Sequence, residues 1–120
     1  MKAEKGKHEI ESDVQSKIQI WCGEHDIIAI RVNVGTFLTM YGSYINAGPP
    51  NGYPDLTLLG YNGHSVYCEC KQKNGRVRDD QKKMHAELRR RGFVVLVPKS
   101  LEQFIKEFEE MGLMEYMVGK

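Results

Sequence analysis

Two charged residues alternate with cysteines in the stretch VYCECKQK, residues 66–73. Successive side chains on a strand point to opposite faces, so Glu69 and Lys71 share one face and Cys68 and Cys70 share the other. The cysteine face is small and apolar, which suits a protein core. The other face holds a carboxylate and an ammonium group about 7 Å apart between Cα atoms, given a rise of about 3.3 Å per residue. This pair is either a surface salt bridge or part of a functional site.

A second carboxylate, Asp55, follows Pro54 at the start of another apolar stretch, PDLTLLG. Asn62-Gly63 lies between the two stretches and favours a type I′ hairpin turn, which needs positive φ at both positions. A hairpin closed there places Asp55 nearly opposite residues 69–70. Two carboxylates that close repel each other unless a cation lies between them. Hard carboxylate oxygens without a histidine cluster suit Mg²⁺ or Mn²⁺ rather than Zn²⁺.

Asp55, Glu69 and Lys71 together suit the hydrolysis of a phosphodiester. A divalent metal would polarise the phosphate and lower the pKa of a bound water. Lys71 would orient or help deprotonate that water and stabilise the developing charge. The alternative is a turn-starting aspartate beside a surface Glu–Lys pair, because Glu-x-Lys alone occurs by chance in many proteins.

The remaining sequence predicts the elements that must position these residues. Apolar spacing predicts a helix over 9–24, and alternation predicts a strand over 27–34. Residues 35–53 are expected to form a long loop with room for one short extra element. After the hairpin strands, 54–60 and 65–71, we expect a helix over 79–91, a buried strand over 93–97 and a helix from 101 that Ser100 and Gln103 cap. The order α-β-β-β-α-β-α indicates an α/β fold, a central mixed sheet flanked by helices.

Length and composition indicate one soluble, globular domain over residues 1–120, because 41% of the residues are hydrophobic and 28% are charged. Its core is expected over about 9–108, and residues 109–120 form a tail that extends the last helix or packs on a partner. No apolar run is long enough for a signal peptide or a membrane span. The three cysteines are an odd number and favour a reducing, intracellular setting.

The formal net charge is only +1, but basic residues concentrate in one region. Nine basic and three acidic residues lie between Lys71 and Arg91, a local net charge of +6. Such a region is compatible with a polyanionic partner. A solvated helix face is the alternative interpretation.

The motifs in combination resemble a known nuclease family. GYPDLTLLG followed by VYCECKQKNGRVRDDQKKMHAELRRRGFVVLV resembles the VRR-NUC domain of the PD-(D/E)xK superfamily, and in particular its small standalone phage or prophage type. RVNVG, residues 31–35, resembles the arginine-containing strand of phage members. The resemblance covers about residues 9–108. It implies a restriction-endonuclease-like core and divalent-metal-dependent cleavage of DNA, with Mg²⁺ as the cofactor and Mn²⁺ as a substitute.

The resemblance also implies a role for each matching residue of the hairpin. Asp55 and Glu69 would be metal ligands, and the backbone carbonyl of Cys70 would join them. Lys71 would orient the attacking water or transfer its proton.

Two helical residues join this catalytic set through the resemblance alone. Glu11 matches the family's helical acid, which reaches the metal through water, and Glu9 is a nearby competitor for that role. Gln81 matches the family's glutamine, which supports Lys71 or contacts the scissile region. Many relatives have proline where this chain has Asp79, which leaves the start of that helix open.

Other polar residues are assigned to the surface or to DNA. Lys73, Arg76, Arg78 and Lys82 are expected to contact phosphates near the site. Arg31 is either a buried ion-pair partner or a phosphate contact. Cys68 and Cys70 are expected in the core rather than in a zinc site, which would need a second pair. The histidines share no metal-binding spacing and are expected at the surface or in turns: His8, His25, His64 and His85.

The expected function is therefore a metal-dependent DNA endonuclease, selective for Holliday junctions or other branched DNA, in repair or recombination. Standalone members of the family form symmetric dimers, and a homodimer would bring two sites to two strands. The expected location is the cytoplasm of a bacterial host, with a prophage as one source. Two alternatives remain open: a non-catalytic DNA-binding module with a nuclease fold, and a nuclease subunit active only with a helicase or other partner.

Overall fold

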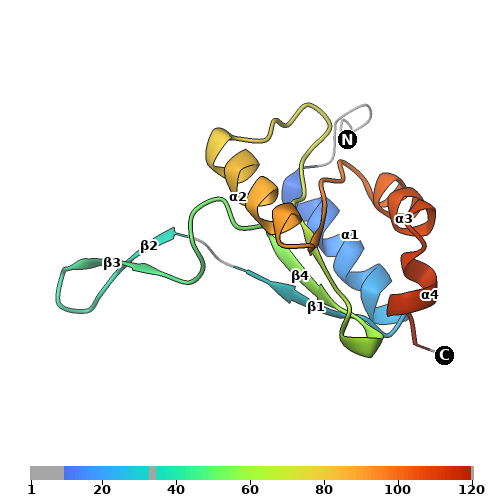
Figure 1. Cartoon of the computed structure of the whole chain (residues 1–120). Helices are drawn as coiled ribbons and strands as arrows, with labels where there is room; N and C mark the ends of the chain where they lie inside the picture. Colours follow the sequence, from blue (N-terminus) through green and yellow to red (C-terminus); the bar gives the residue numbers. More distant parts are fainter. Residues whose placement is uncertain (1–9, 33–34, 120) are drawn as a thin grey trace, which may run out of the picture.

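The computed structural model describes residues 10–32 and 35–119 of the chain (Figure 1). Its main sheet has the strand order β1-β4-β5-β6. The strands are β1 (Ile28–Arg31), β4 (Leu56–Leu59), β5 (Ser65–Cys68) and β6 (Val94–Leu96). The first three pair antiparallel and β6 joins β5 in parallel, so the sheet is mixed, as predicted.

Helices lie on both faces of this sheet (Figure 1): α1 (Glu11–Glu24), α2 (Asp79–Arg90) and α3 (Leu101–Glu110). Residues of α1 and α3 share the hydrophobic core with inward-facing side chains of β4 and β5, among them Val14, Ile18, Phe104, Phe108, Leu56 and Cys68. Cys68 and Cys70 are both fully buried there, as predicted. The opposite face of the sheet receives α2, since its buried polar side chains meet Glu69, which alternates with these cysteines.

The β4–β5 hairpin closes at the predicted turn. Asn62 and Gly63 take φ angles of 60° and 76°, the two positive values that a type I′ turn requires. Leu59 pairs with Ser65, and Leu56 pairs with Cys68. One further step in the same register places Asp55 opposite Glu69, one of the two positions, 69 and 70, that the symmetry about the turn predicted.

The segment predicted as a long loop, residues 35–53, contains a second hairpin. Strands β2 (Gly35–Leu38) and β3 (Tyr44–Ala47) pair antiparallel and form a separate two-stranded sheet. Figure 1 shows this hairpin standing away from the main body. Large apolar side chains are exposed on it, namely Leu38, Met40, Tyr41, Tyr44 and Ile45. The glycines and prolines around the hairpin are typical of loops, so the sequence does not indicate its short strands.

The tail after Phe108 is part of the domain. Gly112, with φ 75°, ends the α3 segment and begins a separate helix, α4 (Leu113–Met117). Leu113 and Met117 are buried in the core. A Cβ at Gly60 would lie 2.6 Å from the Met117 Cβ, so α4 packs directly on the hairpin turn. Among the described residues, no helix is long and apolar enough to cross a membrane.

The loop that leads into β4 packs against the beginning of α2. Gly52 is buried and has φ +85°. A Cβ built on it would lie 2.2 Å from the backbone oxygen of Asp80. Only glycine satisfies both conditions, because a side chain would be strained by the backbone and would overlap the helix. Gly52 therefore ties the approach to Asp55 to the helix that carries Gln81.

We predict that Gly52→Ala destabilises the fold by about 2–4 kcal/mol, because strain and overlap with α2 add together. Gly42→Ala is the matched control: its φ is +83°, but nothing lies within 4 Å of the added Cβ. The control should cost only about 1 kcal/mol for the left-handed backbone. Urea unfolding of both variants measures the difference. Equal losses would show that the contact between the loop and α2 contributes nothing.

Candidate active site

The two predicted carboxylates meet where the β4–β5 hairpin opens. Asp55 is half-buried immediately before β4, and its Oδ2 accepts a hydrogen bond of 2.8 Å from the backbone N–H of Cys70. This bond connects Asp55 to the segment that carries Glu69. The Asp55 side chain, just before β4, is thus fixed to the backbone just after β5.

The pKa of Asp55 reports how close these groups are. It is raised from 3.8 to about 6, chiefly by burial and next by the negative charge of Glu69. The Cys70 N–H and the positive charge of Lys71 act in the opposite direction. Asp55 therefore lies within the electrostatic reach of both charged residues, and the two carboxylates repel each other.

Glu69 and Lys71 lie just beyond β5 but continue alongside the chain that leaves β6. The Glu69 N–H donates to the Leu96 carbonyl at 2.8 Å, and the Lys71 N–H donates to the Pro98 carbonyl at 3.0 Å. Glu69 is fully buried, and Lys71 is only 3% exposed. This burial excludes the surface salt bridge that the sequence left open. Charges so enclosed need partners, because burying an unpaired charge is costly.

Gln81 supplies one of these partners. Its Nε2 donates to Glu69 Oε2 at 3.0 Å, and its Oε1 accepts from the Arg78 backbone N–H at 2.9 Å. The second bond caps the first turn of α2 and fixes which end of the amide faces Glu69. The helix thus begins at Asp79 itself, which resolves the start that the sequence left open.

His85 is the site residue that the sequence analysis missed. It was expected at the surface or in a turn, but it is 3% exposed, and its Nε2 lies 3.2 Å from Glu69 Oε1. Gln81 and His85 are one helical turn apart, so both project from one face of α2 toward the same carboxylate. The signal in the sequence was their i, i+4 spacing. It was overlooked because a histidine in a charged helix was assigned to the solvent side.

Glu11 is the predicted site residue that the structure does not bring into direct contact. It stands in the first turn of α1 and is half-buried. In the described part of the chain, no hydrogen bond or ion pair joins its carboxylate to Asp55 or Glu69. Its competitor, Glu9, lies outside the described residues, as does His8.

The predicted DNA-contacting residues have exposed side chains: Arg31, Lys73, Arg76, Arg78 and Lys82. All but Arg31 lie on the segment from Lys71 into α2. Arg31 is not a buried ion-pair partner. It ends β1 in register with Leu56, so its side chain lies on the Leu56 face of the sheet, at the strand end next to Asp55.

The carboxylates fit a hard divalent cation that keeps part of its water shell. Within the described residues, no three side chains of His, Cys, Asp or Glu gather as a metal cage. Mg²⁺ rarely uses such a cage and is held by one or two carboxylates together with waters and substrate phosphates. Asp55, Glu69 and the Cys70 carbonyl provide that kind of donor set. The raised pKa of Asp55 is consistent with the assignment, because a cation would offset both its burial and its repulsion by Glu69, which raise it.

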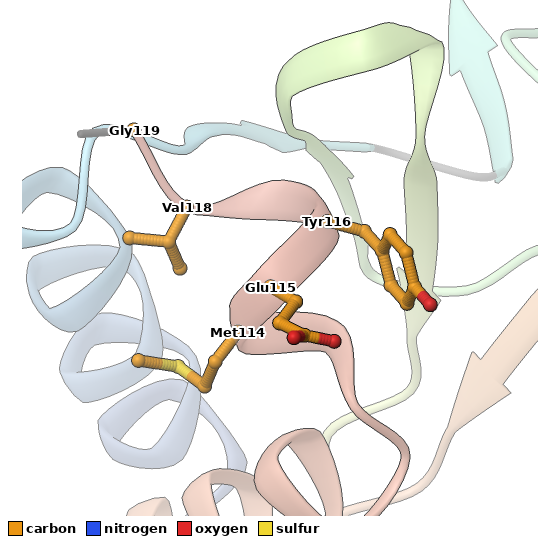
Figure 2. Close-up of a pocket in the computed structure, with 5 residues that line it drawn as sticks. All are labelled: Met114, Glu115, Tyr116, Val118 and Gly119. Carbon is orange, nitrogen blue, oxygen red and sulfur yellow. The ribbon is translucent and has the colours of Figure 1, made fainter.

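A hollow at the other end of the hairpin lacks such chemistry. Met114, Glu115, Tyr116, Val118 and Gly119 line it around α4. Figure 2 shows Tyr116 pointing toward the β4–β5 turn, with Met114 and Val118 on the other side of the helix. Among the described residues that line it, Glu115 alone is charged. Without a convergent set of polar groups, this hollow is no rival to the carboxylate site.

Comparison with known proteins finds similarity among solved structures. No protein-family model and no curated protein matches the chain. A structure described as "VRR_NUC domain" superposes with a TM-score of 0.61 at 23% identity, covering 83% of this chain and 94% of its own. Another, described as "VRR_NUC domain protein", gives 0.59 at 16% identity, covering 90% and 92%. The chain therefore has the fold of VRR-NUC domains, as its motifs predicted.

Proposed function

We propose that this protein is a divalent-metal-dependent DNA endonuclease with its active site at Asp55, Glu69 and Lys71. One observation carries the proposal: two neighbouring carboxylates lie beside a buried lysine in a VRR-NUC fold. A fully buried glutamate that keeps its place beside another acid is costly for stability. A role in binding a catalytic cation would explain why the chain bears that cost.

Each residue has a distinct task in the proposed reaction. Asp55, Glu69 and the Cys70 carbonyl would hold Mg²⁺, or Mn²⁺ in its place. The bound ion would neutralise charge on the scissile phosphate and favour formation of the nucleophile. Lys71 would orient the attacking water and stabilise negative charge on the phosphate oxygens. Gln81 keeps Glu69 in place, and Glu11 would act on the cation through a water.

The exposed basic residues would place the DNA backbone over this site. Lys73, Arg76 and Arg78 lie on the loop that connects Lys71 with α2, and Lys82 lies in the first turns of α2. Contacts with phosphates give affinity and register without reading a base sequence. A substrate chosen by its shape, such as branched DNA, is consistent with this arrangement.

We further propose that the protein acts as a homodimer in a bacterial cytoplasm, in repair or recombination. The apolar side chains exposed on the β2–β3 hairpin, and Ile28 and Ile30 on the edge strand β1, support an association surface. Two copies would present two sites to two strands of a junction. A cleavage assay on branched and plain DNA distinguishes this enzyme from a helicase-dependent subunit and from a module that binds DNA without cutting it.

We predict that Lys71→Met lowers the rate of DNA cleavage at least about 100-fold. Methionine keeps the buried, unbranched side chain but removes the charge and the proton donors. The substrates are a four-way junction, a flap, a nicked duplex and a plain duplex, each with Mg²⁺, Mn²⁺ or EDTA. Lys106→Ala, an exposed lysine on α3, is the control and should cleave like the wild type.

Cleavage by a folded Lys71→Met protein at the wild-type rate would exclude Lys71 from the chemistry. Tight binding of the wild type without cuts in any metal would favour the non-catalytic module. Cuts that appear only when a partner protein is added would favour the dependent subunit. Paired cuts across the junction would support the dimeric enzyme.

We predict that Asp55→Asn stabilises the metal-free protein at pH 7.5. A raised pKa means that the folded state holds the Asp55 proton more tightly than the unfolded chain does. The stabilising contribution of the protonated acid is complete below the unfolded pKa of 3.8, and it is lost as the pH rises through about 6. Asparagine removes that loss. The gain in unfolding free energy should therefore grow between pH 4 and pH 7, measured by urea unfolding in EDTA.

Divalent metal should reverse this difference, so that the wild type becomes more stable than Asp55→Asn. Mn²⁺ at pH 7.5 is expected to raise the melting temperature of the wild type and to leave Asp55→Asn nearly unchanged, since binding to the folded state stabilises it. A stability difference that does not vary with pH would contradict the raised pKa of Asp55. Equal stabilisation of both proteins by Mn²⁺ would remove Asp55 from the metal site.

We predict that Gln81→Glu destabilises the protein by roughly 3 kcal/mol at pH 8 and abolishes cleavage, because it places a carboxylate against the buried Glu69. The new side chain can still accept from the Arg78 N–H, so the helix start is preserved. Gln103→Glu is the matched control. Gln103 also accepts from a backbone N–H, that of Lys99 at 2.9 Å, and donates to a glutamate, Glu107, at 3.2 Å.

The control should cost less than about 1 kcal/mol, because Gln103 and Glu107 are only partly buried. Thermal unfolding and junction cleavage measure both variants. Similar effects of the two substitutions would show that the amide of Gln81 has no special relation to the site.

A further inference from the structure

His85 is buried beside the proposed metal ligands and has no part in the function described so far. Its ring is 3% exposed, although it lies in the helix with the highest density of charge. It stands one turn after Gln81 and one turn before the buried Leu88 on the same face of α2. A leucine would serve packing at this position equally well, so the imidazole requires another explanation.

The contact of His85 with Glu69 gives that explanation. Its Nε2 lies 3.2 Å from Glu69 Oε1, while Gln81 donates to Glu69 Oε2. A carboxylate can only accept hydrogen bonds, so Nε2 carries the proton that enters this bond. An aliphatic residue at position 85 would leave Oε1 without this donor in a fully buried side chain, which is costly.

Two bonds from α2 leave Glu69 with a single orientation. Each oxygen of a carboxylate has two acceptor positions, and α2 occupies one on each oxygen. The remaining positions would be open to a cation beside Asp55. Residues that hold a ligand in this way raise metal affinity, because the ligand need not be ordered when the cation binds.

We propose that His85 is a positioning residue that orients Glu69 for the divalent cation. The inference rests on the proposed function, because it takes Glu69 as a metal ligand. His85 itself does not touch the cation or the DNA. The sequence Gln81-x-x-x-His85 is then one device, with two donors on one helical face that fix the two oxygens of one carboxylate.

The test compares Mn²⁺ affinity in variants of the whole chain without DNA, by calorimetry at pH 8. His85→Leu removes the donor and is expected to raise the Kd for Mn²⁺ about 10- to 100-fold. His85→Gln should stay within about threefold of the wild type, because the amide Nε2 of glutamine reaches about as far as the imidazole Nε2. Leu88→Ala is the control for packing of α2. It should lower the melting temperature and leave the Kd unchanged.

The outcomes separate the inference from the function on which it rests. Wild-type Mn²⁺ affinity in His85→Leu, or an equal loss in His85→Gln, overturns the positioning role while the proposed function stands. A wild-type protein that binds no Mn²⁺ overturns both. If His85→Leu does not fold, His85→Gln is compared with His85→Asn, whose shorter amide cannot reach Oε1. A weaker affinity in the asparagine variant alone supports the proposal, and equal affinities overturn it.

Discussion

The burial of Glu69 is the constraint on which the rest of this site depends. A carboxylate removed from water must receive hydrogen bonds or a cation, or the fold loses several kilocalories per mole. The chain meets this demand from one helix, through Gln81 and His85. The position of α2 against the sheet is therefore set by a polar requirement as well as by packing, and the start of that helix is fixed by the same glutamine.

The sheet contributes the other half of the arrangement. Beyond β5 the backbone N–H groups of Glu69 and Lys71 bond toward the β6 side, while the N–H of Cys70 between them bonds to Asp55. The same alternation that buries the cysteines thus brings the acid of one strand to the acid of the next. Gly52 connects the two halves, because it lets the loop before Asp55 pack against α2. The Cys70 N–H holds Asp55, and two residues of α2 hold Glu69, which is the support that a preorganised site needs.

The charged residues around the site differ in burial and therefore suit different roles. Glu69 is fully buried and held by bonds from α2, whereas the basic residues from Lys73 to Lys82 are exposed on a loop and a helix start. Enclosed groups suit chemistry, and exposed cations suit contacts with a flexible polyanion. The exposed apolar side chains of the β2–β3 hairpin form a third zone, separate from both.

The hairpin and the approach of Asp55 to residues 69–70 follow from the sequence alone, because period-2 alternation and a turn that needs two positive φ angles are local properties. The register that puts Glu69 rather than Cys70 opposite Asp55 belongs to the folded hairpin. The motifs of the sequence also predicted the fold. The packed fold adds three facts: Glu69 is fully buried, His85 faces it, and Gly52 touches α2. These facts depend on how a helix packs across a sheet, and neither composition nor spacing specifies which side of a charged helix meets a buried acid.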